Sequence, residues 1–325
     1  MEDEIRNIVN NLKKKAKLDQ VFVGDDSVGV SKWLSTGIWS VDWVVGGKGF
    51  PYGRVAEVYG DFSSGKTWLG FVLLGRAIEK GDIGVLIETE GAFDPLFGKM
   101  LGVDMKKLIV VSPDTVEQVY QVLDGIFEEG GGKSVVAVWD SLAATPTEHE
   151  IEAGLDVRDM TKALRMSQIL RLITKRVEEK NNLLVVLNQV RDVVGQTWGN
   201  TEVTPGGRAM SFHATVRIKM SRVGKITDST TKEVIGQKFR VECTKSKVCV
   251  PFRYVNIDFI PGKPVPCWEG IVDILKRKGY VVEKGGWNAL VGQEKKWRES
   301  QFGEIVENDE ETRKLVKDVL GLENI

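Results

Sequence analysis

The sequence is poor in the residues that build metal centres and disulfide frameworks. It contains three cysteines and two histidines in 325 residues. Cys243, Cys249 and Cys267 do not show a metal-ligand spacing, so we interpret them as core thiols in a reducing compartment. His149 and His213 are too far apart to suggest a metal site or a catalytic triad.

Long apolar segments and an excess of one charge are also missing. No run is long and apolar enough to span a bilayer, and residues 1–4 (MEDE) do not form an apolar signal region. We therefore expect a cytoplasmic protein without membrane contact. The formal net charge is −1, so any DNA binding has to come from local sites. Apolar residues make up 42%, and the length fits one large domain with a smaller lobe, or two domains.

What the sequence does contain is a phosphate loop. Residues 60–67 (GDFSSGKT) match the pattern G-x-x-x-x-G-K-[ST]. We predict a strand over 54–59 before it and a helix over 68–80 after it. In that setting backbone N–H groups and the helix N-terminus face an anion, Lys66 reaches phosphates and the Thr67 hydroxyl can bind Mg²⁺. A plain glycine-rich turn is the alternative, but the agreement of both flanks disfavours it.

Three further buried strands are predicted to end in polar residues. They cover 84–87, 135–139 and 183–187 and lead into Glu88-Thr89-Glu90, Asp140-Ser141 and Asn188-Gln189. In a parallel sheet such ends meet at the ligand crevice. Asp140 is suited to hold the Mg²⁺ water shell, and Gln189 to sense the γ-phosphate. Either Glu88 or Glu90 could activate the attacking water, and the spacing alone does not choose between them.

Apolar periodicity and turn residues predict the remaining elements. They are helices over 4–18, 115–129 and 160–180, a strand over 108–111, antiparallel strands over 214–220 and 239–244, and a strand over 254–260. A proline-rich stretch, 261–266, reads as a boundary. Beyond it we predict helices near 268–278 and 310–320 and a turn at 284–287.

Two short segments suggest contacts beyond one folded core. The helix over 4–18 is too short to be stable alone, so its apolar stripe is expected to pack on another surface, such as a neighbouring subunit. Lys245 and Lys247, two positions apart on an extended segment, share one face and could aim at one anion. Solvated strand-end lysines are the alternative.

The segment 190–208 is long for a loop inside a compact domain, which is typical of a functional or disordered segment. It carries Arg191 and Arg208, but Asp192 and Glu202 cancel their charge. Binding of a phosphate backbone would therefore rely on main-chain N–H groups and local placement.

Taken together, these motifs resemble the bacterial RecA recombinase family over about residues 34–262, and more loosely beyond. The runs that carry the resemblance, in the family's order, are LSTG (34–37), GDFSSGKT (60–67), FDP (93–95), LGVD (101–104), DSLAA (140–144), NQVR (188–191), GG (206–207), KSK (245–247), and EK (283–284) with GW (286–287). Phosphate loops occur in many families, whereas NQVR, the glycine-rich loop and the paired lysines together point to recombinases.

The resemblance implies an α/β fold: a RecA-type P-loop NTPase core with a mostly parallel central sheet flanked by helices. Residues 1–33 would form an N-terminal helix and linker that dock on the next protomer. Residues 34–262 would form the ATPase core with two DNA-binding loops, at about 152–165 and 191–208. Residues 263–325 would form a small α/β lobe, a candidate for contact with duplex DNA.

The resemblance also implies a function, that of an ATP-dependent DNA recombinase. Such a protein forms a helical filament on single-stranded DNA, pairs it with homologous double-stranded DNA and exchanges strands, with DNA-stimulated ATP hydrolysis. Recombinational repair and the SOS response to DNA damage are the expected settings, and ATP and Mg²⁺ the expected cofactors. The alternatives are a hexameric motor such as a helicase, which generally uses an arginine finger, and a regulatory paralogue without productive turnover, against which Glu90 argues.

Matched by position, the resemblance assigns roles to individual residues and selects Glu90 over Glu88. The catalytic set would be Glu90, Lys66, Gln189, Lys245 and Lys247, with both lysines serving the neighbouring subunit's ATP. The nucleotide site would comprise Gly60, Asp61, Phe62, Ser63, Ser64, Gly65, Lys66, Thr67, Trp68, Asp94, Phe97, Asp140 and Ser141, with Mg²⁺ held by Thr67 and Asp140. DNA would contact Met160, Arg165, Arg171, Arg191, Val194, Trp198, Gly206, Gly207 and Arg208. Gln189 and Phe212 would couple the two sites.

Several positions depart from the family's pattern. Gly91 stands where bacterial members usually carry His, Trp198 where Phe is common, and Pro261 where an aromatic often lies near the base. Trp139 is unusually large for its place before the metal Asp. The chain stops at Ile325 without the acidic tail typical of bacterial members. These departures fit a diverged or phage-encoded member.

Overall fold

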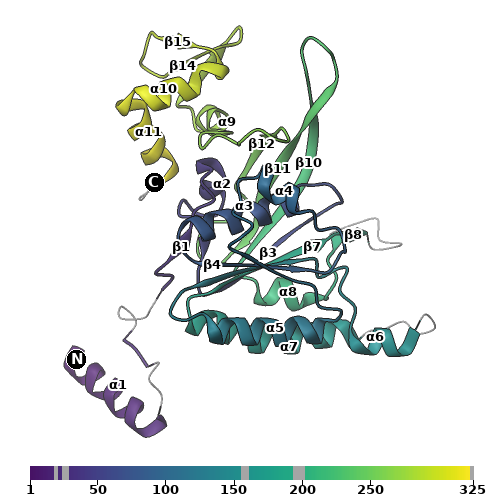
Figure 1. Ribbon diagram of the computed structural model, residues 1–325. Coiled ribbons are helices and arrows are strands. Elements are labelled where there is room, and N and C mark those ends of the chain that lie inside the picture. Colours follow the sequence, from purple (N-terminus) through teal and green to yellow (C-terminus); the bar gives the residue numbers. More distant parts are fainter. Residues whose placement is uncertain (18–20, 24–28, 155–160, 193–201, 323–325) are drawn as a thin grey trace. The chain divides into compact units, whose positions relative to one another are not determined.

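The structure is a computed structural model that describes residues 1–17, 21–23, 29–154, 161–192 and 202–322 (Figure 1). The chain divides into two compact units, Met1–Lys32 and Trp33–Ile325. Among the described residues, no helix has the length and hydropathy of a membrane span.

The first unit is built on helix α1 (Glu2–Ala16), close to the predicted range. Glu2, Asp3 and Glu4 lie in its first turn and lysines in its last, which suits the helix dipole at both ends. None of its residues is buried, and the apolar stripe of Ile5, Ile8 and Leu12 is exposed. The stripe is therefore open to a partner surface.

The second unit is organised around an eight-stranded sheet with the order β12-β11-β10-β3-β7-β6-β4-β5. The strands are β3 (Arg54–Gly60), β4 (Ile83–Glu88), β5 (Leu108–Val111), β6 (Val135–Asp140), β7 (Leu183–Gln189), β10 (Val216–Thr227), β11 (Val234–Ser246) and β12 (Tyr254–Phe259). Pairing is parallel from β10 through to β5, and only β11 and β12 are added antiparallel. The predicted mostly parallel α/β sheet is confirmed.

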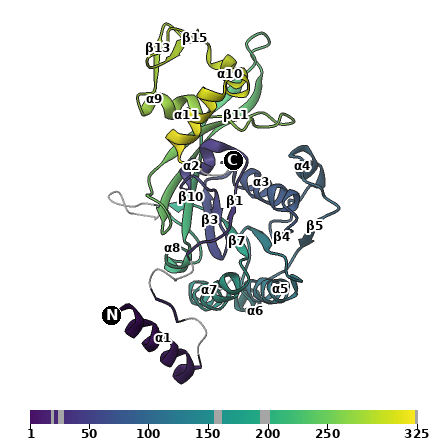
Figure 2. The same cartoon turned by 90° about the vertical axis from the view of Figure 1, so that its left-hand side faces the viewer.

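Helices cover both faces of this sheet (Figures 1 and 2). One apolar cluster joins the sheet to α2 (Trp39–Val44) and α3 (Lys66–Glu79), and α4 (Pro95–Met100) lies on the same side. A second cluster joins the opposite face to α5 (Val116–Glu129), α7 (Thr161–Glu179) and α8 (Arg208–His213). The near-continuous apolar strands follow from burial on both faces.

Most predicted elements of the core are present with small shifts at their ends, and two predictions need correction. The antiparallel hairpin is longer than predicted, because β10 and β11 continue past the sheet with register shifts, so Lys245 lies inside β11 rather than after it. The predicted helix 268–278 begins later, as α9 (Ile271–Arg277). Several short elements were not predicted, among them β1 (Trp33–Leu34), β2 (Phe50–Pro51), α2, α4, α6 (Glu148–Ala153) and α8.

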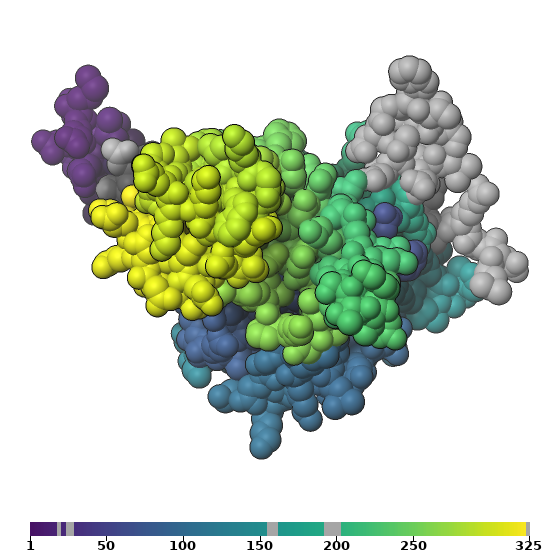
Figure 3. All heavy atoms as spheres, turned by 90° about the horizontal axis from the view of Figure 1, so that it is seen from above, coloured from purple at the N-terminus to yellow at the C-terminus, as the bar shows by residue number. Residues whose placement is uncertain are grey.

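The C-terminal part contains α9, a small sheet, η3 (Glu299–Gln301), α10 (Phe302–Asn308) and α11 (Glu310–Leu320). The sheet consists of β13 (Val281–Lys284), β14 (Trp287–Leu290) and β15 (Lys296–Trp297). Its apolar residues, including Ile271, Leu275 and Leu320, belong to the same buried cluster as α2 and β12. In Figure 3 its yellow atoms abut the green atoms of the strand region without a gap. The domain division at residue 263 stays a prediction.

Gly49 gives a test of the packing at the start of the second unit. Its φ is +92°, and a Cβ there would lie 2.2 Å from the Leu34 carbonyl oxygen, on the partner strand of β2. Gly49→Ala should therefore lower the free energy of unfolding by more than about 3 kcal/mol, measured by urea denaturation. Gly81→Ala is the control, because Gly81 has φ +85° with open space around it. It should cost only about 1–2 kcal/mol, and equal losses in both variants would contradict the packing argument.

Candidate nucleotide site

The phosphate loop connects β3 to α3, and two of its glycines are required by close contacts. A Cβ on Gly60 would lie 2.0 Å from the Met220 carbonyl oxygen, and one on Gly65 would lie 2.9 Å from the Phe239 ring. Gly65 has φ +90° and is the N-cap of α3, which begins at Lys66, two residues earlier than predicted. The first-turn N–H groups of a buried helix therefore face the loop's concave side, where an anion is favoured.

Lys66 is folded back over its own loop. Its Nζ donates to the carbonyl oxygens of Gly60 (3.0 Å) and Asp61 (2.7 Å). Burial lowers the pKa of Lys66, while the nearby carboxylates of Asp140 and Glu90 act in the opposite direction. An ammonium group held by neutral carbonyls is ready to exchange them for phosphate oxygens, which bind it more strongly.

Asp140 lies at the end of β6, next to the helix start. The Thr67 hydroxyl donates to Asp140 Oδ2 at 2.7 Å. Burial raises the pKa of Asp140 to about 6, with the Thr67 hydrogen bond opposing the shift. A hydroxyl and a carboxylate in contact beside a phosphate cradle match the oxygen ligands that Mg²⁺ prefers.

The two glutamates that the spacing left open are separated by the structure. Glu88 is buried, and its Oε1 accepts hydrogen bonds from the backbone N–H groups of Glu90 (3.0 Å) and Ala92 (3.1 Å). Glu90 points to the cavity, where its Oε1 accepts from Ser141 Oγ (2.5 Å) and Gln189 Nε2 (3.0 Å). Glu88 thus binds the backbone of the turn, whereas Glu90 lines the cavity. The catalytic role of Glu90 stays a prediction.

These side chains line a cavity of about 350 Å³. Trp68, Phe97, Phe239 and Phe259 form aromatic walls, with the Trp68 ring 6.1 Å from Phe239 and 5.9 Å from Phe259. Sequence reasoning missed Gln237, Phe239 and Phe259, which reach the cavity from β11 and β12. Pro261, which stands where the family often has an aromatic, does not line the cavity, whereas Phe259, two residues earlier, does. Asp94 does not line the cavity, and its Oδ1 caps α4 by accepting from Leu96 N (2.8 Å).

Two polar atoms of this cavity suit a nucleotide. Ser64 Oγ and Gln237 Oε1 are buried without a hydrogen-bond partner among the described residues. Buried polar groups normally have partners, so both atoms are ready to bind a ligand. One lies in the phosphate loop and the other near the aromatic walls, the arrangement that a nucleoside triphosphate with Mg²⁺ would fill.

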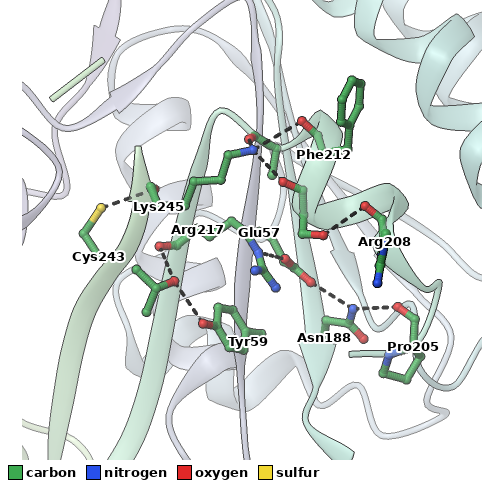
Figure 4. Close-up of polar contacts among 12 residues, drawn as sticks. Glu57, Tyr59, Asn188, Pro205, Arg208, Phe212, Arg217, Cys243 and Lys245 are labelled. Carbon is green, nitrogen blue, oxygen red and sulfur yellow. Dashed lines mark hydrogen bonds and ion pairs between the residues drawn. The ribbon is translucent and has the colours of Figure 1, made fainter. Parts of the chain in front are cut away.

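The paired lysines do not line this cavity. Lys245 Nζ donates to the carbonyl oxygens of Ser211 (2.6 Å), Phe212 (3.2 Å) and Ala214 (2.7 Å) at the end of α8 (Figure 4). Lys247 Nζ lies 3.5 Å from the same Phe212 carbonyl oxygen. Both cations therefore lie at the negative end of α8, in which Phe212 is 74% exposed.

Four of the predicted DNA-binding residues line two hollows. One, of about 420 Å³, is lined by Arg191, Pro205 and Gly206 together with Lys162, which sequence reasoning missed. The other, of about 300 Å³, is lined by Gly207, Arg208 and residues of β3 and β10. Strands β8 (Arg191–Asp192) and β9 (Glu202–Val203) pair in antiparallel fashion beside these hollows.

The remaining DNA-binding predictions fall elsewhere. Arg165 lines neither hollow and lies 3.6 Å from Glu117 in an ion pair. Arg171 is exposed on α7. Met160, Val194 and Trp198 lie outside the described residues. The unusual Trp139 is fully buried, and its Nε1 donates to Thr145 Oγ1 at 3.0 Å, so the core accommodates it with its polar atom satisfied.

A phosphate loop at the carboxyl edge of a mostly parallel sheet defines the class of P-loop nucleotide-binding proteins. The family model of the RecA N-terminal domain matches residues 3–266. The chain therefore belongs to the RecA family of recombinases.

Curated relatives agree with this assignment. Protein RecA of Chlorobaculum parvum is 32% identical over 297 residues, which cover 91% of this chain and 84% of the relative. Protein RecA of Rhizobium leguminosarum bv. viciae is 36% identical over 255 residues, 78% of this chain and 72% of the relative. A crystal structure of the RadB recombinase matches the fold with a TM-score of 0.54 at 19% identity, covering 69% of this chain and 95% of that one.

Lys66→Ala tests the nucleotide site directly. We expect about a tenfold to hundredfold weaker affinity for a fluorescent ATP analogue with Mg²⁺, because a charge-assisted hydrogen bond is lost. Lys80→Ala is the matched control, since Lys80 is the C-cap at the other end of α3, where Nζ donates to Trp33 O. Equal binding by the Lys66 variant and the wild type would show that the analogue binds elsewhere.

Proposed function

We propose that this chain is an ATP-dependent DNA recombinase that assembles on single-stranded DNA and carries out homologous pairing and strand exchange. Membership of the RecA family supports the general activity. The observation that carries the proposal is the 3.0 Å hydrogen bond from Gln189 Nε2 to Glu90 Oε1, at the nucleotide cavity. Gln189 ends β7 and is followed almost directly by Arg191, which lines the first hollow. The end of β7 thus carries both a residue of the nucleotide cavity, Gln189, and the start of the proposed DNA-binding loop.

We infer the roles of the side chains in ATP hydrolysis from the family resemblance, and this geometry supports them. Glu90 would orient and deprotonate the attacking water, held in place by the Ser141 and Gln189 hydrogen bonds. Lys66 would exchange the carbonyls of its own loop for phosphate oxygens. Thr67 and Asp140 would hold Mg²⁺, which when bound neutralises charge on the phosphates.

The placement of Lys245 and Lys247 supports a shared site between copies. Neither residue lines the nucleotide cavity of its own chain. If they contact a γ-phosphate, as the family resemblance implies, that phosphate belongs to a neighbouring subunit. Nucleotide binding and assembly would then stabilise each other by linkage. The exposed stripe of α1 offers a second surface for such an assembly.

Glu90→Gln tests the catalytic assignment. We expect ATP turnover in the presence of single-stranded DNA to fall about 100-fold or more, because the general base is lost, while affinity for the ATP analogue is retained. Glu88→Gln is the comparison, and it should chiefly lower the melting temperature. If single-stranded DNA failed to raise wild-type turnover at all, the recombinase proposal would be refuted.

The assembly is tested by electron microscopy with single-stranded DNA and a slowly hydrolysed ATP analogue. The wild type should form helical filaments, and Lys247→Ala should form fewer and shorter ones at the same protein concentration. Lys225→Ala, on β10 beyond the core, is the charge-matched control. Closed hexameric rings in place of filaments would favour a motor of the helicase type.

A further inference from the structure

A fully buried carboxylate lies in the central strand of the core, outside the catalytic set. The side chain of Glu57, in β3, is 0% exposed (Figure 4). Burying an ionised carboxylate is strongly unfavourable unless it is paired and hydrogen-bonded. Ala56 and Val58 belong to the apolar cluster on one face of the sheet, so Glu57 faces the other side, where α7 and α8 pack. An apolar side chain would be expected at such a position. The position therefore calls for an explanation other than packing.

Its partners come from the two adjacent strands. Arg217 on β10 is directly opposite Glu57 in the parallel register, and its Nε donates to Glu57 Oε2 at 2.5 Å. Asn188 on β7 donates from Nδ2 to Glu57 Oε1 at 3.0 Å. The Arg217 guanidinium also stacks over the Tyr59 ring, 4.6 Å from its centroid. Arginine, glutamate and asparagine thus form a polar row across three strands.

Asn188 extends this row to the loop segment. The same Nδ2 group donates to the Pro205 carbonyl oxygen at 3.1 Å, and Oδ1 accepts from Gln189 N at 3.0 Å. The backbone next to Pro205 packs closely against neighbouring side chains. A Cβ on Gly206 would lie 3.2 Å from Leu142, and one on Gly207 would lie 3.1 Å from Ala163. We call residues 204–207 the anchored segment. It separates the two hollows described above.

Asn188 and Gln189 face opposite sides of the sheet. Side chains alternate between the two faces along β7: those of Val185 and Leu187 belong to one apolar cluster, and those of Leu184 and Val186 to the other. Gln189 consequently contacts Glu90 in the nucleotide cavity, while Asn188 contacts Pro205 on the other side. A shift of this strand end would move both contacts together.

We propose that Asn188, fixed in place by Glu57 and Arg217, is a positioning residue that ties the anchored segment to the nucleotide site. The row sets the position of Asn188, and Asn188 sets the position of the Pro205 carbonyl. When Gln189 changes its contact with Glu90, the anchored segment responds through its direct neighbour on the chain. The part of this inference that concerns DNA rests on the proposed function. The coupling between the nucleotide site and the anchored segment can be measured without DNA.

The first readout is amide hydrogen exchange in peptides that cover residues 202–208, with and without a slowly hydrolysed ATP analogue and Mg²⁺. In the wild type we expect the nucleotide to change exchange in these peptides. In Asn188→Ala that change should be lost. Asn182→Ala is the matched control: Asn182 is also buried, precedes the other end of β7, and its Oδ1 accepts from Val135 N at 2.8 Å. It should lose stability but keep the nucleotide response.

The second readout is the single-stranded DNA concentration that gives half-maximal stimulation of ATP turnover. We expect about a tenfold increase in Asn188→Ala, the effect of one lost hydrogen bond that orders a binding segment. Asn182→Ala should keep the wild-type value. If DNA does not stimulate the wild type but its loop responds to nucleotide and Asn188→Ala abolishes the response, the recombinase proposal fails and the positioning role stands.

A double variant separates stability from positioning. Asn188→Asp alone places a second carboxylate beside buried Glu57 and should lower the melting temperature strongly. Adding Glu57→Gln removes the like-charge pair and should recover much of that temperature. It should not recover the exchange response, because no donor faces the Pro205 carbonyl. The proposal is overturned if wild-type exchange ignores the nucleotide, if Asn188→Ala keeps the response, if Asn182→Ala also loses it, or if the double variant regains it.

Discussion

Parallel pairing of β3, β7, β6 and β4 is the constraint on which the site depends. It brings the carboxyl ends of these strands to one edge of the sheet, where the polar residues that end or follow them can meet. The phosphate loop, Glu88, Asp140 and Gln189 all occupy that edge. Residues from distant parts of the chain thereby come within hydrogen-bond distance, as the contacts of Glu90 with Ser141 and Gln189 show.

The position of these residues at one edge of the sheet explains why some of them could be predicted from the sequence. A buried apolar run that closes on a polar residue marks a strand end, so Asp140 and Gln189 could be predicted from pattern alone, and so could the sheet. Nothing in the spacing could choose between Glu88 and Glu90, because the choice depends on which carboxylate accepts the backbone N–H groups of the turn. The family resemblance selects Glu90, and this catalytic assignment stays a prediction.

Other residues could not be found from pattern because their role depends on how the hairpin packs. Phe239 and Phe259 read as ordinary apolar positions of alternating strands, and only the packing of β11 and β12 beside α3 turns them toward Trp68. Lys162 is one polar residue among several on the helix predicted over 160–180, and only the fold brings it beside Arg191 and Gly206. The sequence shows Glu57 only as one acid in an apolar strand, and its complete burial between two neighbouring strands becomes visible only in the fold.

That burial bears on how a sheet can transmit a change. A well-packed apolar strand resists sliding equally at every position, since dispersion contacts are many and weak. A polar row concentrates its interactions in a few directional bonds, and each bond is costly to leave unmade. The row formed by Arg217, Glu57 and Asn188 is therefore stable in the one arrangement that satisfies its hydrogen bonds, and other arrangements cost free energy. Pro205 is joined to this row, and Gln189 is covalently joined to it on the opposite face. Under the coupling proposed above, a small displacement of Gln189 at the nucleotide cavity would therefore also move the anchored segment, because Asn188 is bonded to both.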